Sequence, residues 1–245
     1  MNDPQAIWPA PAKLNLMLRI TSRRADGYHE LQTVFQFLDL SDELRFRVRQ
    51  DEFISCSGIP GLEHEDNLIV RAAKLLQTTA QTRLGSEISV QKNLPMGGGL
   101  GGGSSDAATS LLALNQLWGT NLESARLAKL GLQLGADVPV FVYGQAAWAE
   151  GIGEKITPVS LPDPWYLVLT PPVHVSTGKI FCDSRLTRDA DRIKIRDFLA
   201  GQHDNLCLPV VRNRYPEVGL ALDWLGNYAE ARLTGTGACI FAVFQ

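Results

Sequence analysis

Cysteine is scarce in this sequence, and the four cysteines lie far apart. None belongs to a Cys-x-x-Cys pair, and no histidine stands at the spacing that a zinc site needs. The spacing therefore argues against a structural zinc site and against a disulfide framework. We expect Cys56, Cys182, Cys207 and Cys239 to be free thiols, buried or half-buried, in a reducing cytosol.

An excess of charge and long apolar runs are also lacking. The chain has 23 lysines and arginines against 26 aspartates and glutamates, which gives a net charge of −3. This balance offers no electrostatic basis for binding nucleic acid or an anionic membrane. No apolar run reaches membrane-spanning length, and Met1-Asn2-Asp3-Pro4 lacks the basic and apolar regions of a signal peptide. We expect a cytoplasmic protein without a membrane or nucleic-acid partner.

Glycine, in contrast, is concentrated in one place, because the stretch from Pro95 to Ala108 contains six glycines. A loop with so few side chains can bring backbone N–H groups close to a ligand and can adopt positive φ angles. The pattern that follows predicts a helix, with Ser104 and Ser105 as cap candidates. A glycine loop that leads into a helix is typical of a phosphate site, where hydroxyl groups can also bind phosphate or phosphate-bound Mg²⁺.

A flexible linker, a dinucleotide fold and a Walker loop all fit this stretch less well. A linker is disfavoured, because a strand pattern precedes the loop and a helix pattern follows it. Gly97, Gly99 and Gly102 satisfy G-x-G-x-x-G, but residues 117–123 contain no second strand with the acidic residue that a dinucleotide fold requires. A Walker loop is absent as well, since Gly178-Lys179 is followed by Ile180 and lacks the upstream glycine.

The periodicity of apolar residues predicts a mixture of strands and helices. Over residues 12–20 it predicts a half-buried strand with Lys13 and Asn15 on the open face. Further strands are predicted at 32–40, 43–49, 86–92, 146–150, 165–170 and 240–244. Helices are predicted at 68–79 behind an Asn67 cap, after the glycine loop, at 123–134 with Gly135 as C-cap, at 193–200 and at 217–228. Because strands often follow strands directly, we expect an α+β fold with domains 1–150 and 151–245.

Six stretches, taken in order, carry a resemblance to a known family. They are Pro-Ala-Lys-Leu-Asn-Leu, Arg-Ala-Asp-Gly-Tyr-His-Glu-Leu, Asp-Asn-Leu-Ile-Val-Arg-Ala, the glycine loop, Gly-Ala-Asp-Val-Pro-Val-Phe and Leu-Thr-Gly-Thr-Gly-Ala-Cys. Together they resemble the GHMP kinases, the small-molecule kinases that include galactokinase, homoserine kinase and mevalonate kinase. The match is closest to members of the non-mevalonate route to isoprenoids, whose substrate carries a cytidine diphosphate group.

The resemblance implies a two-domain α+β fold, with an N-terminal domain like ribosomal protein S5, a C-terminal ferredoxin-like domain and the active site in the cleft between them. It also implies transfer of the γ-phosphoryl group of ATP, with Mg²⁺, to the 2-hydroxyl of an erythritol unit. Family members continue some tens of residues past the last motif, whereas this sequence ends at Gln245. We therefore expect a second domain that is truncated or shorter. A monomer and a homodimer both remain open.

The catalytic residues follow from the same resemblance. It implies that Asp137 accepts the proton of the attacking hydroxyl, although Asp137 also stands where an ordinary helix N-cap would. It implies that Lys13 keeps Asp137 ionised and stabilises the charge that develops, the alternative being an exposed strand lysine. Asn15 shares the face of Lys13 and is expected to orient a hydroxyl or a phosphate, or else to be a solvated strand residue.

The resemblance also implies a substrate site. Tyr28 and His29 are expected to bind the cytosine, Phe181 to close the other side of its ring and Thr177 to lie near the diphosphate. The alternatives are a half-buried turn aromatic for Tyr28 and a helix core residue for Phe181. A metal at His29 is disfavoured, because no second histidine stands at ligand spacing.

The implied ATP site consists of the glycine loop and two flanking residues, with no dedicated metal ligands. Its members are Pro95, Met96, Gly97, Gly98, Gly99, Leu100, Gly101, Gly102, Gly103, Ser104, Ser105, Asn67 and Lys92. Asn67 and Lys92 would border the adenine, the alternatives being a helix cap and a solvated strand end. Mg²⁺ would bind through phosphates and water, with Ser104 as a candidate ligand. The turn at residues 235–238 would pack beside the substrate phosphates, or else be a plain hairpin turn.

Two rival functions compete with this one. The first is a GHMP kinase that acts on a different small-molecule alcohol, and the second is a catalytically silent nucleotide-binding module. The turn that contains Tyr28 and His29 argues against the first, because an aromatic ring in a donor-rich turn suits a nucleobase. The presence of both Lys13 and Asp137 argues against the second.

Overall fold

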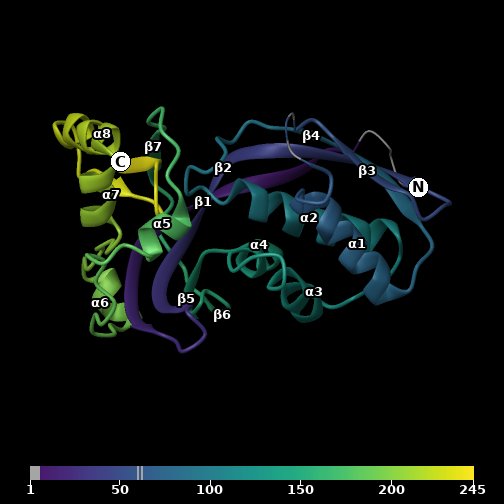
Figure 1. Cartoon of the computed structure of the whole chain (residues 1–245), viewed down its shortest axis with the longest axis horizontal. Coiled ribbons are helices and arrows are strands. Elements are labelled where there is room, and N and C mark those ends of the chain that lie inside the picture. The colour runs from purple at the N-terminus through teal and green to yellow at the C-terminus, as the bar shows by residue number, and fades with distance from the viewer. Residues whose placement is uncertain (1–5, 60, 62) are drawn as a thin grey trace. The chain divides into compact units, whose positions relative to one another are not determined.

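The computed structural model describes residues 6–59, 61 and 63–245, so residues 1–5, on which we expected no signal peptide, lie outside it. The chain divides into two compact units (Figure 1). Unit 1 comprises the residues up to Ala12 together with 38–94 and 101–144, and unit 2 comprises 13–37, 95–100 and 145–245. Two long strands, β1 (Trp8–Arg23) and β2 (His29–Arg49), have residues in both units.

The described part of unit 1 combines strands with four helices. The C-terminal half of β2 pairs antiparallel with β4 (Gly85–Gln91), and β4 pairs parallel with β3 (Ile54–Ser57). The helices are α1 (Leu68–Ala80), α2 (Gly102–Leu117), α3 (Ser124–Gly131) and α4 (Val138–Tyr143). Helices α1 and α2 lie along one face of these strands (Figure 1), where Leu44 and Phe46 of β2 are buried opposite Val90 and Ile88 of β4.

Three local predictions in unit 1 were wrong. Residues 32–40 and 43–49 belong to one strand, β2, because the carboxylate of Asp42 is buried and accepts hydrogen bonds from the N–H groups of Asn93 and Leu94. Ser104 and Ser105 do not cap α2, since the N-cap is Gly101 in a left-handed conformation at φ 76°. Helix α3 ends at Gly131, although the N–H of Gly135 still donates to Gly131 O.

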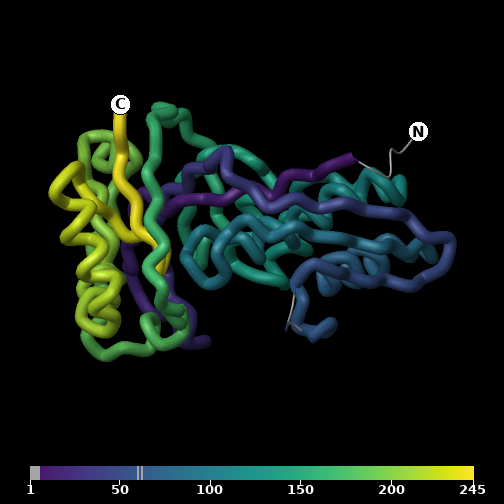
Figure 2. Tube along the Cα trace, turned by 90° about the horizontal axis from the view of Figure 1, so that it is seen from above, coloured from purple at the N-terminus to yellow at the C-terminus, as the bar shows by residue number. Residues whose placement is uncertain are grey.

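Unit 2 contains the N-terminal half of β2 and a small second sheet. This half of β2 pairs with β5 (Ala147–Gly151), which pairs with β6 (Lys155–Pro158). The second sheet has the antiparallel order β7 (Trp165–Leu169), β9 (Ile240–Phe244), β8 (Arg232–Leu233), and Figure 2 shows β9 running beside β7. The helices are α5 (Thr177–Phe181), α6 (Ile195–Leu199), α7 (Leu208–Arg214) and α8 (Pro216–Gly226). Strands β6 and β8 and helix α7 were not predicted.

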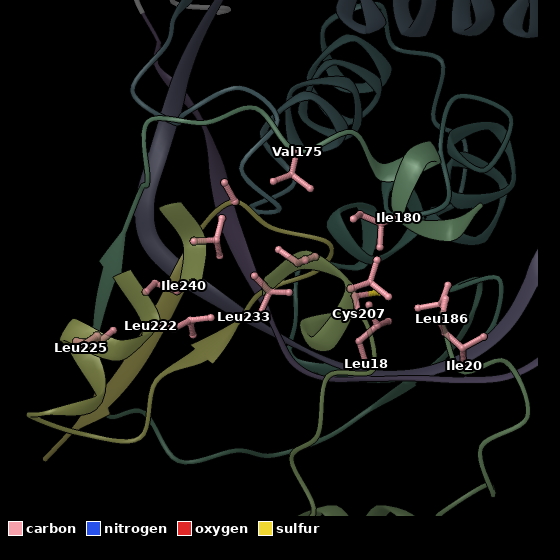
Figure 3. Close-up of a cluster of buried hydrophobic side chains, with 14 of the residues drawn as sticks. Leu18, Ile20, Val175, Ile180, Leu186, Cys207, Leu222, Leu225, Leu233 and Ile240 are labelled. Carbon is pink, nitrogen blue, oxygen red and sulfur yellow. The ribbon is translucent and has the colours of Figure 1, made fainter. Parts of the chain in front are cut away.

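The core of unit 2 is a cluster of buried apolar side chains (Figure 3). Leu18 and Ile20 of β1 meet Cys207, Leu222 and Ile240 from the C-terminal part of the chain. The four side chains predicted on the inner face of β1, namely Leu14, Leu16, Leu18 and Ile20, are buried as expected. The prediction for the cysteines was wrong at Cys182, whose thiol is free but exposed. No helix in the described ranges has the length and apolar character to cross a membrane.

Candidate active site

Lys13 is buried, with 2% of its surface exposed, so the alternative of a solvated strand lysine is wrong. Its Nζ donates hydrogen bonds to Asn15 Oδ1 and, over 3.1 Å, to Gly99 O. The same ammonium lies 5.5 Å from the centre of the Phe35 ring. The backbone N–H of Lys13 donates to Leu100 O over 2.9 Å. Strand β1 is therefore bonded to the glycine loop through both the main chain and the lysine side chain.

Asn15 joins Lys13 and the glycine loop to the last motif. Its backbone N–H donates to Thr234 Oγ1 over 2.9 Å, and its Nδ2 donates to Thr33 Oγ1 over 2.8 Å. Thr234 Oγ1 in turn donates to Gly99 O over 3.2 Å. Because Nδ2 is directed at Thr33, the Asn15 carbonyl oxygen faces Lys13 and fixes the position of the ammonium. Residues from β1, the glycine loop and the segment after β8 thus meet at one carbonyl oxygen, Gly99 O.

The first glycines of the loop allow this close approach. Gly97 and Gly99 have φ angles of 72° and 81°, in the region that favours glycine. A Cβ atom on Gly98 would lie 2.6 Å from Cys239 Sγ, and one on Gly99 would lie 2.4 Å from Thr234 O. The N–H of Cys239 donates to Gly98 O over 3.0 Å. These glycines are needed for packing against the last motif, whatever ligand the loop binds.

The start of α2, in unit 1, lies close to the segment that leads to Asp137. The first N–H groups of α2 have no partner within the helix, which makes this end a suitable place for an anion. A Cβ atom built on Gly135 would lie 3.7 Å from Ser104 Oγ. Asp137 is the N-cap of α4 by its position, but its side chain makes no capping hydrogen bond. Capping alone therefore does not explain an aspartate here.

Lys92 belongs to a buried charge cluster that the sequence did not predict. Its Nζ donates to Asp42 Oδ2 and, over 2.8 Å, to Asp106 Oδ2, so the alternative of a solvated strand end is wrong. Asp42 receives two further backbone hydrogen bonds, whereas Asp106 Oδ1 is buried without a hydrogen-bond partner among the described residues. Two carboxylates share one ammonium, so Lys92 balances only one of the two negative charges. Burial accordingly raises the pKa of Asp106 to about 6, against the opposing attraction of Lys92.

The raised pKa of Asp106 predicts how stability depends on pH. A carboxyl group whose pKa is higher in the folded state stabilises that state when protonated, and this contribution is lost as pH rises through about 6. The loss amounts to about 3 kcal/mol, since the pKa of the carboxyl is about 6 in the folded state and 3.8 in the unfolded chain. Asp106→Asn should remove this loss and be more stable than the wild type at pH 8 by about 1–3 kcal/mol, but not at pH 4. Urea unfolding at both pH values measures the difference.

The matched control is Asp42→Asn. It places the same amide in the same cluster, but it weakens the two hydrogen bonds from the backbone to the carboxylate. We expect this variant to be less stable than the wild type at both pH values. An Asp106→Asn variant that also loses stability at pH 8 would mean that attraction to Lys92 outweighs the cost of burying the charge.

The structure brings together some of the residues expected to bind substrate. The ring of His29 stacks on that of Phe181, with centroids 5.2 Å apart and planes at 25°. Thr177 Oγ1 lies 2.9 Å from Thr236 Oγ1, which joins it to the last motif. Tyr28, in contrast, is 60% exposed, so the alternative of a half-buried turn aromatic is wrong. Asn67 caps α1, its Oδ1 accepting from the N–H of Ile69 over 2.9 Å.

Several site residues could not be found from the sequence. Thr234 and Asp106 stand inside stretches that had been recognised, but only the fold shows that Gly99 and Lys92 are their partners. Arg188 has no local pattern around it, and yet its guanidinium donates to His29 Nε2 over 3.1 Å. No signal in the chain near Arg188 could have identified it.

Comparison with known proteins agrees with this geometry. Residues 67–145 match the family model of the GHMP kinases N terminal domain, and residues 186–245 match that of the GHMP kinases C terminal. A crystal structure of 4-(cytidine 5'-diphospho)-2C-methyl-D-erythritol kinase superimposes with a TM-score of 0.83 at 32% identity, covering 98% of this chain and 90% of the other. The Methanococcus jannaschii mevalonate kinase shares the fold, with a TM-score of 0.72 at 16% identity over 98% of this chain and 90% of its own.

Curated relatives are closer in sequence. The 4-diphosphocytidyl-2-C-methyl-D-erythritol kinase of Pseudomonas syringae pv. syringae (strain B728a) is 59% identical over 245 residues, which cover 100% of this chain and 87% of the relative. The kinase of the same name from Nitrosococcus oceani is 57% identical over 240 residues, 98% of this chain and 86% of the relative.

The fold and the matched motifs define the chain as a small-molecule kinase of the GHMP family, the ATP-dependent class that the six stretches predicted. Within that family it belongs to the 4-diphosphocytidyl-2-C-methyl-D-erythritol kinases. The predicted α+β fold with GHMP kinase domains is confirmed, whereas the roles of individual residues stay predictions.

Proposed function

We propose that this kinase transfers the γ-phosphoryl group of ATP to the 2-hydroxyl of 4-diphosphocytidyl-2-C-methyl-D-erythritol, with Asp137 as the general base and Lys13 as the catalytic cation. The observation that carries the proposal is the meeting of three motifs at Gly99 O, where a buried ammonium is held by Asn15 and by the loop. Substrate identity rests on the relatives, whose name specifies it.

In the proposed reaction, the 2-hydroxyl oxygen forms a bond to the γ-phosphorus, and the bond from that phosphorus to the β-γ bridging oxygen breaks. The bridging oxygen leaves with ADP, and the hydroxyl proton goes to the Asp137 carboxylate. Lys13 stabilises the negative charge that develops on the transferred group and the attacking oxygen. Phosphoryl transfer needs little covalent work from a protein, so positioning and charge account for most of the catalysis.

The phosphates of ATP are proposed to bind the glycine loop and the first N–H groups of α2. Mg²⁺, when bound, neutralises phosphate charge during the transfer. In the described part of the chain, no group of three or more histidine, cysteine, aspartate or glutamate side chains is placed so that it could hold a metal ion. We assign the ion to phosphate oxygens and water, with the Ser104 hydroxyl as the candidate protein ligand.

The proposal also assigns residues to the two bases of the ternary complex, the cytosine and the adenine. We place the cytosine at His29, Phe181 and Tyr28, with Thr177 near the diphosphate, and support comes from the stacking of His29 on Phe181. The adenine is assigned to Asn67 and Lys92.

We further propose that the chain acts in the cytoplasm and that residues 1–150 and 151–245 form its ATP-binding and C-terminal domains.

A turnover assay tests the proposed substrate. The purified chain is incubated with ATP, Mg²⁺ and 4-diphosphocytidyl-2-C-methyl-D-erythritol, and the phosphomonoester product is followed by ³¹P NMR. We expect turnover, and we expect cytidine monophosphate to compete with this substrate rather than with ATP. Turnover of galactose, homoserine or mevalonate instead would keep the family and overturn the substrate. ATP binding without turnover of any of these alcohols would favour a silent nucleotide-binding module.

A further inference from the structure

Arg188 makes four hydrogen bonds that bring His29 and the segment after α5 together. Its Nη2 donates to Phe181 O and to Asp183 O, each over 2.8 Å, and its Nη1 donates to Leu186 O over 3.1 Å. Its Nε donates to His29 Nε2 over 3.1 Å. One guanidinium therefore holds the backbone that carries Phe181 and also contacts the imidazole that stacks on the Phe181 ring.

The bond to His29 determines where the imidazole carries its proton. A guanidinium keeps all its protons at any physiological pH, so its Nε can only donate. His29 Nε2 must then be the acceptor, and a neutral imidazole that accepts at Nε2 has its proton on Nδ1. The pKa of His29 is lowered by burial and by the positive charges of Arg188 and Arg23, which favours this neutral form.

We propose that Arg188 is a positioning residue for cytosine recognition: by holding His29 Nε2 as an acceptor, it fixes the Nδ1–H tautomer, whose donor suits an acceptor on the cytosine edge. This inference rests on the proposed cytosine site. Cytosine N3 is an acceptor, whereas uracil N3 carries a proton, so a fixed donor directed at N3 favours cytosine over uracil. Arg188 need not touch the base, because it acts through His29.

The test compares Arg188→Met with Arg185→Met. Arg185 is a matched control, because it braces the same segment by donating to the Asp183 carboxylate over 3.0 and 2.8 Å. Binding of cytidine diphosphate and uridine diphosphate is measured by calorimetry with the ATP site filled by a non-hydrolysable ATP analogue. We expect Arg188→Met to weaken cytidine diphosphate about tenfold and to reduce the cytidine-to-uridine preference. Arg185→Met should change both by less than about twofold.

Two further measurements distinguish the positioning of His29 by Arg188 from a general bracing of the segment after α5. In a His29→Ala background, Arg188→Met should weaken the binding of cytidine diphosphate by a further factor of less than about two. The reason is that the residue through which Arg188 acts is gone. In the wild type, ¹⁵N chemical shifts should show His29 protonated at Nδ1 and not at Nε2, a result that does not depend on any variant folding. Retained affinity for the ATP analogue verifies that each variant is folded.

Three outcomes would overturn the inference. The first is an equal loss of affinity for cytidine diphosphate in the two methionine variants. The second is a full tenfold loss of that affinity on Arg188→Met in the His29→Ala background. The third is a wild-type His29 protonated at Nε2. A wild type that binds no cytidine diphosphate would also overturn it, since no cytosine would be recognised. If the wild type binds cytidine diphosphate in an Arg188-dependent way but does not phosphorylate the proposed alcohol, the inference stands and the proposed function fails.

Discussion

Replacing Asp137 by asparagine should lower kcat by about 10²-fold or more while leaving the KM for ATP and for the alcohol nearly unchanged. The carboxylate is proposed to accept the hydroxyl proton, and an amide of the same shape cannot do so. The substitution is otherwise mild, because asparagine is as good an N-cap as aspartate and Asp137 makes no capping hydrogen bond to α4. Steady-state kinetics with both substrates varied measures the effect.

Asp66→Asn is a matched control for this prediction. Asp66 also lies near a helix start, one residue before the Asn67 cap of α1, and it is exposed. The same loss of one negative charge should leave kcat within about twofold of the wild type, because exposed charges act weakly at a distance. A fast Asp137→Asn enzyme would leave Asp137 with a structural role at the start of α4 and would require another proton acceptor.

Local patterns predicted the elements of the fold where one physical rule dominated. Alternation along β1 identified the buried face of Leu14 to Ile20, and Asn67 before an apolar period identified the start of α1. The rule failed on the other face of β1, where Lys13 and Asn15 are buried as well. Their partners, Gly99 and Thr234, are far away in sequence, and periodicity contains no information about such contacts.

In the candidate site, too, local stretches could be predicted from the sequence, whereas contacts between distant residues could not. The motifs identified the family, because each of them is a contiguous stretch whose residues can be read in order. The charge cluster at Lys92 could not be predicted, since Asp42 lies fifty residues before it in the sequence and is buried within the long strand β2. Arg188 shows the limit most clearly, because its hydrogen-bond partner is a histidine 159 residues away.

Lys13→Met should lower kcat by about 10³-fold, which corresponds to about 4 kcal/mol of transition-state stabilisation. Methionine keeps most of the apolar stem of the lysine, but it supplies no charge over the Phe35 ring and no donor to Asn15 Oδ1 or Gly99 O. An ammonium that acts on developing charge affects kcat more than KM. Single-turnover measurements at saturating ATP separate this effect from product release.

Lys179→Met and Asn15→Ala are the comparison variants for the loss of kcat expected in Lys13→Met. Lys179, on α5, is exposed, so its loss should leave kcat within about twofold. Asn15→Ala removes one of the oxygens that position the Lys13 ammonium, while Gly99 O still binds it, so an intermediate loss of about tenfold is expected. If Lys13→Met instead raised the KM for ATP at an unchanged kcat, the lysine would bind ground-state phosphate, and the charge that develops in the transition state would need a different cation.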